Sequence, residues 1–385
     1  MGTASTMACI AAALGLTPLK GATAPAVSSA RLRVAEEVGA NAVAVAAAKR
    51  SPQSFLTKES FLNAIVVLQA IGGSTNAVVH LMAIINRHPA LCGKEITLNT
   101  VDEIGRKVPL LIDLKPSGDN YMNDFHNAGG MLALLHRLRP LLYLSAKTVT
   151  GITLGELLDR NPFRSFPASE SIIRPLTNPL YPASSLVVLH GNLAPGGAVT
   201  KASASKDRRL LSHSGPAVVF RNSADLARRL DDPDLPVTAD SVLVLQGIGP
   251  AGNPGMPEAG LIPIPRKLAA KGVTDMLRLS DGRMSGTAGG TIVLHISPEA
   301  VAPDAVFGVV QDGDMITCDV EKRLLRLEVD EEEIRTRLAA HKEATARQGH
   351  VWTDRETRRG YRGLYERTVN QAEEGCDFDF LRAAK

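Results

Sequence analysis

The sequence of 385 residues has few of the features that mark secreted, membrane-spanning or nucleic-acid-binding proteins. Its four cysteines (Cys9, Cys92, Cys318 and Cys376) stand at long, irregular intervals without a CxxC motif, which argues against a disulfide framework and favours a reducing, cytoplasmic setting. The longest apolar runs are too short to cross a bilayer, so no membrane partner is expected. The first residues also lack the basic and apolar regions of a signal peptide.

An excess of charge of one sign is missing as well. The net charge is +3, and basic residues are spread along the chain beside acidic ones, so a nucleic-acid partner is not expected. With 44% hydrophobic residues the chain can build an ample core, and its length exceeds that of one typical domain. We therefore expect a globular protein of two domains.

The first predicted domain covers residues 1–165 and is expected to be α/β. Apolar periodicity predicts helices over Met7–Leu14 and Ala30–Lys49, and two more within residues 59–87 on either side of a Gly-rich break. Short strands are expected among the helices that follow. Five prolines in residues 161–183 indicate a linker or a long loop.

The second predicted domain, residues 166–385, is rich in short β-type runs joined by Gly-rich loops, which favours a barrel. Two helices are expected at its end, over Glu331–Arg347 and Asp354–Ala372. The expected strands are Ser185–Leu189, Ala217–Phe220, Ser241–Leu245, Thr291–Ile296 and Phe307–Val310, with a hairpin formed by Met315–Val320 and Leu324–Val329.

Five Gly-rich loops carry polar side chains, and they are either plain turns or parts of one ligand site. They are Gly72–Asn76, Pro116–Asp124, Gly191–Gly197, Gly247–Gly260 and Ser280–Thr287. One of them matches GxGxxG, but Pro250, Pro254 and Pro257 fall where a dinucleotide-binding fold needs a helix. A nucleotide site is therefore not expected, and five polar loops favour a shared site.

Three of these loops contain candidate residues. The amides of Ser74, Thr75 and Asn76 would begin a helix, so they either cap it or bind a carboxylate. Glu258, in a proline-bordered turn, is either a solvated acid or a ligand for a hard cation. Ser285 is either a capping serine or a base, and the second role requires a nearby cation because a free serine is a very weak acid.

Taken together and in order, several motifs resemble the dihydroxy-acid/phosphogluconate dehydratase family. They are Gly73–His80, Pro116–Asp124, Gly191–Val199, Gly252–Glu258 and Ser280–Gly286. The resemblance implies an N-terminal α/β domain and a C-terminal β-barrel like the swivelling domain of aconitase. It also implies an active site between the domains and across a homodimer or homotetramer.

The family removes water from a 2,3-dihydroxy acid to give a 2-keto acid, so the resemblance implies a small polyhydroxy acid as the substrate. At the matching positions Ser285 resembles the alkoxide base and Glu258 a Mg²⁺ ligand. Asp119, Asn192 and Arg283 resemble supporting or substrate-binding residues. An iron–sulfur cluster acts as the Lewis acid on the 3-hydroxyl in this family.

The chain departs from the family pattern at its start. In the family, the three cluster cysteines, the Mg²⁺-binding aspartate and a modified lysine come before the position of Met1, so the cluster ligands are absent from this chain. We therefore expect an N-terminally truncated dehydratase, with a catalytically inactive remnant as the alternative. The motif in residues 359–381 resembles sugar-acid (aldonate) dehydratases more than branched-chain enzymes.

Overall fold

The computed structural model describes the chain except for residues 94, 287–288, 349–358 and 384–385. It divides into two compact units. Unit 1 comprises Met1–Ala77 and Gly93–Leu186, and unit 2 comprises Val78–Cys92 and Val187–Lys385. In the described parts of the chain, no helix is both long enough and apolar enough to span a membrane.

Unit 1 consists of helices in its described residues. They are α1 (Thr3–Ala13), α2 (Ser29–Ala47), α3 (Lys58–Ala70), α5 (Leu98–Gly105), α6 (Met122–Asn127), α7 (Gly130–Leu138), α8 (Leu154–Arg160), α9 (Pro167–Ile172) and the first two residues of α4 (Asn76–Arg87). The helices expected near residues 7–14, 30–49 and 59–87 are confirmed. Gly15, with φ +73°, follows the first of them in a left-handed conformation that glycine adopts without strain.

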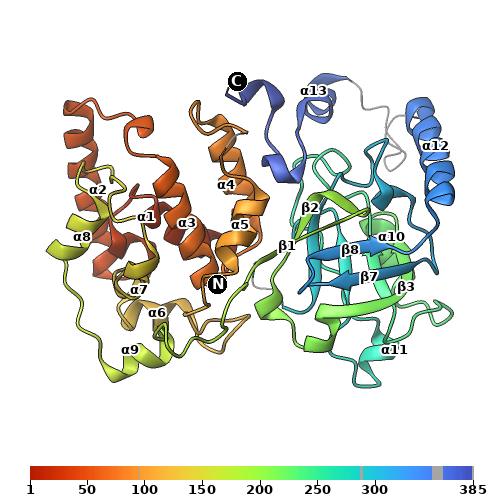
Figure 1. Ribbon diagram of the computed structural model, residues 1–385, viewed down its shortest axis with the longest axis horizontal. Helices are drawn as coiled ribbons and strands as arrows, with labels where there is room; N and C mark the ends of the chain where they lie inside the picture. The colour runs from red at the N-terminus through yellow and green to blue at the C-terminus, as the bar shows by residue number, and fades with distance from the viewer. Residues whose placement is uncertain (94, 287–288, 349–358, 384–385) are drawn as a thin grey trace. The chain divides into compact units, whose positions relative to one another are not determined.

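Helix α3 lies between α1 and α5 (Figure 1). A capping box starts it, in which the amide of Thr57 donates to Ser60 Oγ at 2.9 Å. Most residues that follow are buried on every side of the helix, which is the pattern of a central helix rather than a surface one.

The expected α/β character of this part is wrong for the residues that the structure describes, because they contain isolated bridges and no strand. The apolar run from Val108 to Leu114 is buried, but its amides bond to separate segments. Leu111 donates to Ala70 O at 2.8 Å and Asp113 to Ile172 O at 2.9 Å. Without a continuous partner strand, no ladder forms.

Unit 2 is built on a closed barrel in the order β1-β2-β6-β5-β4-β3-β7-β8 (Figure 1). Strands β3 to β6 pair in parallel through β4 and β5, and the other pairs are antiparallel except β1 with β8. The strands are β1 (Val187–Gly191), β2 (Ala194–Thr200), β3 (Ser212–Phe220), β4 (Val242–Leu245), β5 (Arg278–Ser280), β6 (Ile292–Ser297), β7 (Met315–Asp319) and β8 (Leu324–Leu327). The predicted barrel and the predicted hairpin are confirmed.

Helices surround this barrel: α10 (Ser223–Arg229), α11 (Arg266–Ala269), α12 (Glu331–Gln348) and α13 (Gly360–Thr368). Helix α12 packs Ile334 against the barrel core. The expected helix over Glu331–Arg347 is confirmed; of the one expected over Asp354–Ala372, residues 354–358 lie outside the described residues and the next part forms α13.

One predicted strand, Phe307–Val310, is wrong. This segment forms a 3₁₀ turn over Val306–Val309. Phe307 and Val310 both pack into the barrel core, whereas residues three apart on a strand would face opposite sides.

Candidate active site

Two predicted loops meet at one end of the barrel because the strands before them are parallel neighbours. Leu245 at the end of β4 pairs with Ser280 at the end of β5, so the chain leaves both strands at the same edge. Arg283 joins the two loops. Its Nε donates to Met256 O at 2.7 Å, and its own carbonyl oxygen accepts from Gly260 N at 2.7 Å.

These contacts hold the segment that carries Glu258 against the segment that carries Ser285. Glu258 is exposed, and Ser285 is half-buried two residues after Arg283. The structure thus brings together three of the predicted site residues, and it gives Ser285 a cationic neighbour along the chain.

Two buried carboxylates hold the loop Gly247–Gly260 through its backbone amides. Asp281 accepts hydrogen bonds from the amides of Gly247 and Ile248 at 3.0 and 3.1 Å. Glu299 accepts from the amides of Ala251 and Gly252, at 2.8 Å from the latter. Four amides of the GxGxxG stretch are therefore occupied by acids of the chain itself.

Burial governs the ionisation of both acids. It raises the pKa of Asp281 to about 6, against the stabilising effect of the amide hydrogen bonds. It raises the pKa of Glu299 to about 7, and the negative charge of Asp281 adds to this effect. At neutral pH these two neighbouring groups therefore titrate.

His80 belongs to the same cluster of charges. It lies half-buried on the part of α4 that is in unit 2. Burial lowers the pKa of His80, the positive charge of Arg283 lowers it further, and Glu258 opposes both. His80 therefore lies within electrostatic reach of both loops.

The C-terminal segment holds α4 in place. Asn86 Nδ2 donates to Glu374 O at 2.8 Å, and Arg87 forms a two-point ion pair with Asp377. The thiol of Cys376 lies 3.2 Å from Met256 Sδ in the loop before Glu258. One segment thus contacts both α4 and the loop of the candidate acid.

A second histidine was missed by the sequence analysis. His295 lies in β6, is 3% exposed and has φ +57°. Burial, together with the positive charge of Arg283 and the charge of His80, lowers its pKa to about 3. The available signal was a histidine among apolar residues in the predicted strand Thr291–Ile296.

Asn192 has a structural role in the barrel. Its Nδ2 donates to Leu327 O at 3.0 Å, and its Oδ1 accepts from Leu327 N at 2.8 Å. Both ends of the side chain are used to bind β8 to the turn between β1 and β2. This fits a supporting residue.

The remaining predicted residues lie in unit 1. Ser74, Thr75 and Asn76 are buried at the start of α4, where Asn76 N donates to Ser74 Oγ at 3.2 Å and Ser74 N to Thr6 Oγ1 at 3.0 Å. These are the contacts of a helix cap. Asp119 is exposed, and its amide donates to a neighbouring carboxylate; a substrate role for all four stays a prediction.

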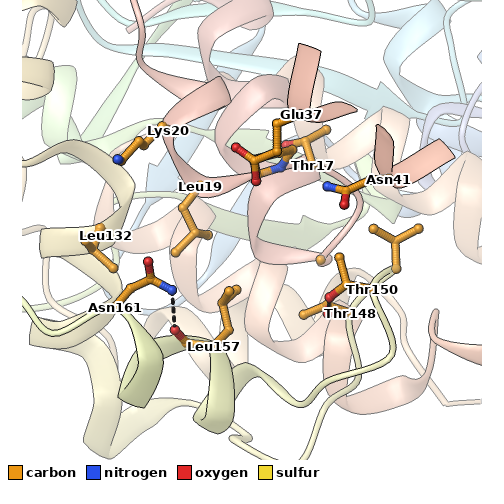
Figure 2. A pocket seen from close by; sticks show the side chains of 13 residues that line it. Thr17, Leu19, Lys20, Glu37, Asn41, Leu132, Thr148, Thr150, Leu157 and Asn161 are labelled. Carbon is orange, nitrogen blue, oxygen red and sulfur yellow. Dashed lines mark hydrogen bonds between the residues drawn. The ribbon is translucent and has the colours of Figure 1, made fainter. Parts of the chain in front are cut away.

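Unit 1 also contains a pocket that none of the predicted site residues lines. Figure 2 shows the side chains of Lys20, Glu37 and Asn41 around it, together with those of Thr148 and Thr150. Polar and apolar side chains both line this pocket, and their combination does not indicate a particular ligand.

The cysteines do not fit a metal cluster. Cys9 lies in α1 of unit 1, Cys318 lies in the barrel core, and burial raises the pKa of Cys9, Cys318 and Cys376 to about 12. Burial therefore favours the neutral thiol at these three positions when no metal is bound. Among the described residues, no group of three or more His, Cys, Asp or Glu side chains could hold a metal ion.

The chain thus combines a helical unit with an eight-stranded barrel of mixed parallel and antiparallel strands. Loops at one end of the barrel carry a glutamate, an arginine and a serine, which is the composition of a polar active site. The chain belongs to the dihydroxy-acid/6-phosphogluconate dehydratase family. The family's N-terminal domain matches residues 1–157 and its C-terminal domain matches residues 171–376. Both domains of the family are thus represented in the chain, and the expected truncation is not supported by this match.

Named relatives agree with this family. The chain is 42% identical to 6-deoxy-6-sulfo-D-gluconate dehydratase of Pseudomonas putida, over 100% of this chain and 64% of the relative. It is 42% identical to L-arabinonate dehydratase of Rhizobium leguminosarum bv. trifolii (97% and 62%), and 37% identical to dihydroxy-acid dehydratase 1 of Methanosarcina acetivorans (97% and 64%). The chain thus spans less than two thirds of the length of these relatives.

Proposed function

We propose that this chain serves the reaction of its family, the dehydration of a 2,3-dihydroxy carboxylic acid to a 2-keto acid, with a sugar acid as the substrate. The observation that carries the proposal is the double contact of Arg283, which holds the loop of Glu258 against the loop of Ser285. Nothing in the comparisons supports the alternative of an inactive remnant.

The reaction needs help at two carbons. The proton on C2 is weakly acidic and hydroxide is a poor leaving group from C3. We propose that Ser285 Oγ first takes the C2 proton, which leaves the C–H electron pair in an enolised carboxylate, and that this pair then forms the C2=C3 bond. The 3-hydroxyl leaves as hydroxide, which takes up a proton from solvent to become water, and the enol then tautomerises to the keto acid without any net oxidation.

Arg283 supports the serine in this scheme. A serine hydroxyl becomes a base only where positive charge stabilises the alkoxide, and we propose that Arg283, two residues away along the chain, supplies such charge. Together with Ser74, Thr75, Asn76, Asp119 and Asn192, Arg283 is also proposed to bind or support the substrate.

Mg²⁺ is the proposed cofactor, with Glu258 as one ligand. Mg²⁺ commonly takes one or two carboxylates and completes its shell with water and substrate oxygens, so an exposed carboxylate in a rigid turn is compatible with it. When bound, the ion would polarise the carboxylate and 2-hydroxyl of the acid. The described cysteines do not fit an iron–sulfur cluster, and no step is assigned to one.

The relatives favour a sugar acid over a branched-chain acid. Identity is 42% to two dehydratases named for sugar acids and 37% to the dihydroxy-acid enzyme. The C-terminal motif favours the same choice. We further propose a cytoplasmic homodimer or homotetramer, and a barrel like the swivelling domain of aconitase.

The central experiment follows exchange at C2, which does not require completion of the dehydration. Purified protein is incubated with Mg²⁺ and five- or six-carbon aldonic acids in D₂O, and proton NMR records loss of the C2 proton and appearance of a 2-keto acid. Ser285→Ala should reduce both by about 10²-fold or more, the usual contribution of a general base.

The matched control is Ser214→Ala, since Ser214 lies on β3 and bonds Thr317. It should behave as the wild type. If Ser285→Ala exchanges at the rate of this control, Ser285 is not the base. If no aldonic or branched-chain dihydroxy acid is exchanged or converted by the wild type, the proposed function fails.

Glu258→Gln tests the metal assignment. Replacing a charged oxygen ligand with a neutral one weakens Mg²⁺ binding, so half-maximal exchange should require at least about 10-fold more Mg²⁺. Titration of Mg²⁺ against the exchange rate measures this. Glu321→Gln, at an exposed turn position, is the control; equal Mg²⁺ requirements in the two variants would make Glu258 a loop acid.

A further inference from the structure

The imidazole of His295 is buried without satisfying its polar atoms. The side chain is 3% exposed, and neither Nδ1 nor Nε2 has a hydrogen-bond partner among the residues that the structure describes. Buried polar groups in folded proteins are nearly always paired, so each exception calls for an explanation. A ligand that completes the pairing is one explanation.

The backbone around His295 departs from regular strand geometry. Ser297 pairs with Gly197 and Leu294 with Val199, so two residues of β6 stand opposite one residue of β2. This is a β-bulge, and His295 in it has φ +57°, a conformation that costs a non-glycine residue energy. Bulges of this kind often re-aim a side chain beside a site.

The surroundings of the ring are those of the candidate active site. The amide of His295 donates to Gly282 O at 3.2 Å, in the loop that carries Arg283 and Ser285. The charges of Arg283 and His80 act on the ring. Because His80 is only half-buried, the cluster reaches solvent on the side of α4.

The chemistry of the ring selects the kind of group that it can bind. Burial and Arg283 keep its pKa at about 3, so the imidazole is neutral in the physiological range. A neutral imidazole has one donor and one acceptor, which is what a hydroxyl group requires, whereas a carboxylate is better paired with a guanidinium such as that of Arg283.

We propose that His295 is a substrate-binding residue that hydrogen-bonds a hydroxyl group of the polyhydroxy acid. This rests on the proposed function for the identity of the acid. His295 would then select acids by their hydroxyl groups. This role differs from that of the residues proposed to act on the C2 proton.

The test uses calorimetry to compare the binding of two ligands to the wild type and to three variants, with Mg²⁺ present. The ligands are a five-carbon aldonic acid and its 3-deoxy analogue. Wild-type protein should bind the aldonic acid at least about 10-fold more tightly, since a site built for a hydroxyl leaves polar atoms unpaired with the deoxy compound. His295→Leu should bind both ligands equally.

His295→Asn is the conservative variant, because asparagine tolerates a positive φ and keeps a donor and an acceptor. It should recover part of the preference. His213→Leu, at a histidine of β3 that bonds Asp240 O, should leave the preference unchanged. Circular dichroism and thermal melting establish that each variant is folded.

The outcomes separate the two proposals. A folded His295→Leu that prefers the aldonic acid as strongly as the wild type overturns the inference, and so does a wild type with no preference. If the preference depends on His295 but no C2 exchange or keto acid is detected, the inference stands and the dehydratase proposal fails. A shift of the His295 ring resonances on addition of the aldonic acid, seen by NMR, would confirm direct contact.

Discussion

At the scale of single residues, two buried basic side chains of unit 2 differ in whether their charge is paired. Arg278 is buried but forms an ion pair with Asp275 at 2.7 Å and bonds Ile262 O at 3.0 Å. Lys201 is also buried, yet its Nζ has no hydrogen-bond partner among the described residues. Burial lowers the pKa of Lys201 to about 7, so folding disfavours its charged form.

Lys201→Met should therefore stabilise the protein. Because the pKa in the folded state lies below that of the unfolded chain, the stability contribution of Lys201 is complete above its ordinary pKa of 10.5 and is lost as pH falls towards 7. The gain in free energy of unfolding should be on the order of 1–3 kcal/mol at pH 7 and smaller at pH 9.5. Urea denaturation at both pH values measures it.

Lys322→Met, at a side chain that is 76% exposed, serves as the control and should change little. A Lys201→Met protein less stable than the wild type at pH 7 would mean that the ammonium group has a partner. The interaction with that partner would then offset the free energy lost on burying the charge.

At the scale of elements, the helices of the first half and most strands of the second were predictable, because their apolar periodicity agrees with their final burial. Strand β2 was missed since Pro195, Gly196 and Gly197 are typical of a turn. The structure explains Gly196: a Cβ there would lie 2.8 Å from Glu373 Oε1 and 2.9 Å from Ser297 Oγ. The C-terminal segment therefore packs closely on this strand, and a larger residue would require the Glu373 side chain to move.

In the candidate site too, some features were predictable from the sequence and others were not. The motifs predicted Glu258, Arg283 and Ser285 as members of one site because each residue type has a recognisable chemistry. The contact that joins their loops uses backbone carbonyl oxygens, which carry no sequence signal. His295 was missed for a similar reason, since a bulge and a positive φ cannot be read from an apolar strand pattern.

Gly375 provides an element-scale prediction for the C-terminal segment on α4. Its φ is +111°, and an added Cβ would lie 2.4 Å from Ala83 N. Gly375→Ala should therefore push residues 372–383 away from α4 and reduce the free energy of unfolding by about 2 kcal/mol or more, through strain and lost packing. Hydrogen exchange of residues 372–383 should accelerate.

Gly360→Ala is the matched control, because Gly360 also has a positive φ (+66°) but no atom of the described residues within 4 Å of the added Cβ. It should cost only the conformational strain, about 1 kcal/mol, and leave exchange in residues 372–383 unchanged. Equal effects of the two substitutions would show that the close approach to Ala83 does not hold the segment.

At the scale of the whole molecule, ionisable groups under the candidate site tie stability to pH. Asp281 and Glu299 have raised pKa values of about 6 and about 7, so their contribution to stability is complete in acid and is lost as pH rises through these values. His295 acts in the opposite direction, because its lowered pKa of about 3 favours the folded state above its ordinary pKa of 6.5 and destabilises it in acid. Between about pH 4 and 6.5 the effect of these two carboxyl groups on stability and the effect of His295 therefore oppose one another.

Glu299→Gln isolates one of these effects. Glutamine keeps an oxygen for the amides of Ala251 and Gly252 but cannot ionise, so its contribution does not change with pH. Relative to the wild type, the variant should become more stable by about 1–3 kcal/mol as pH rises from 4.5 to 8, with most of the change between pH 5 and 7.5. Urea denaturation of both proteins across this range gives the difference, from which the effect of His295 cancels. A difference that does not vary with pH would mean that Glu299 is ionised throughout, and that the loop amides outweigh the cost of burying its charge.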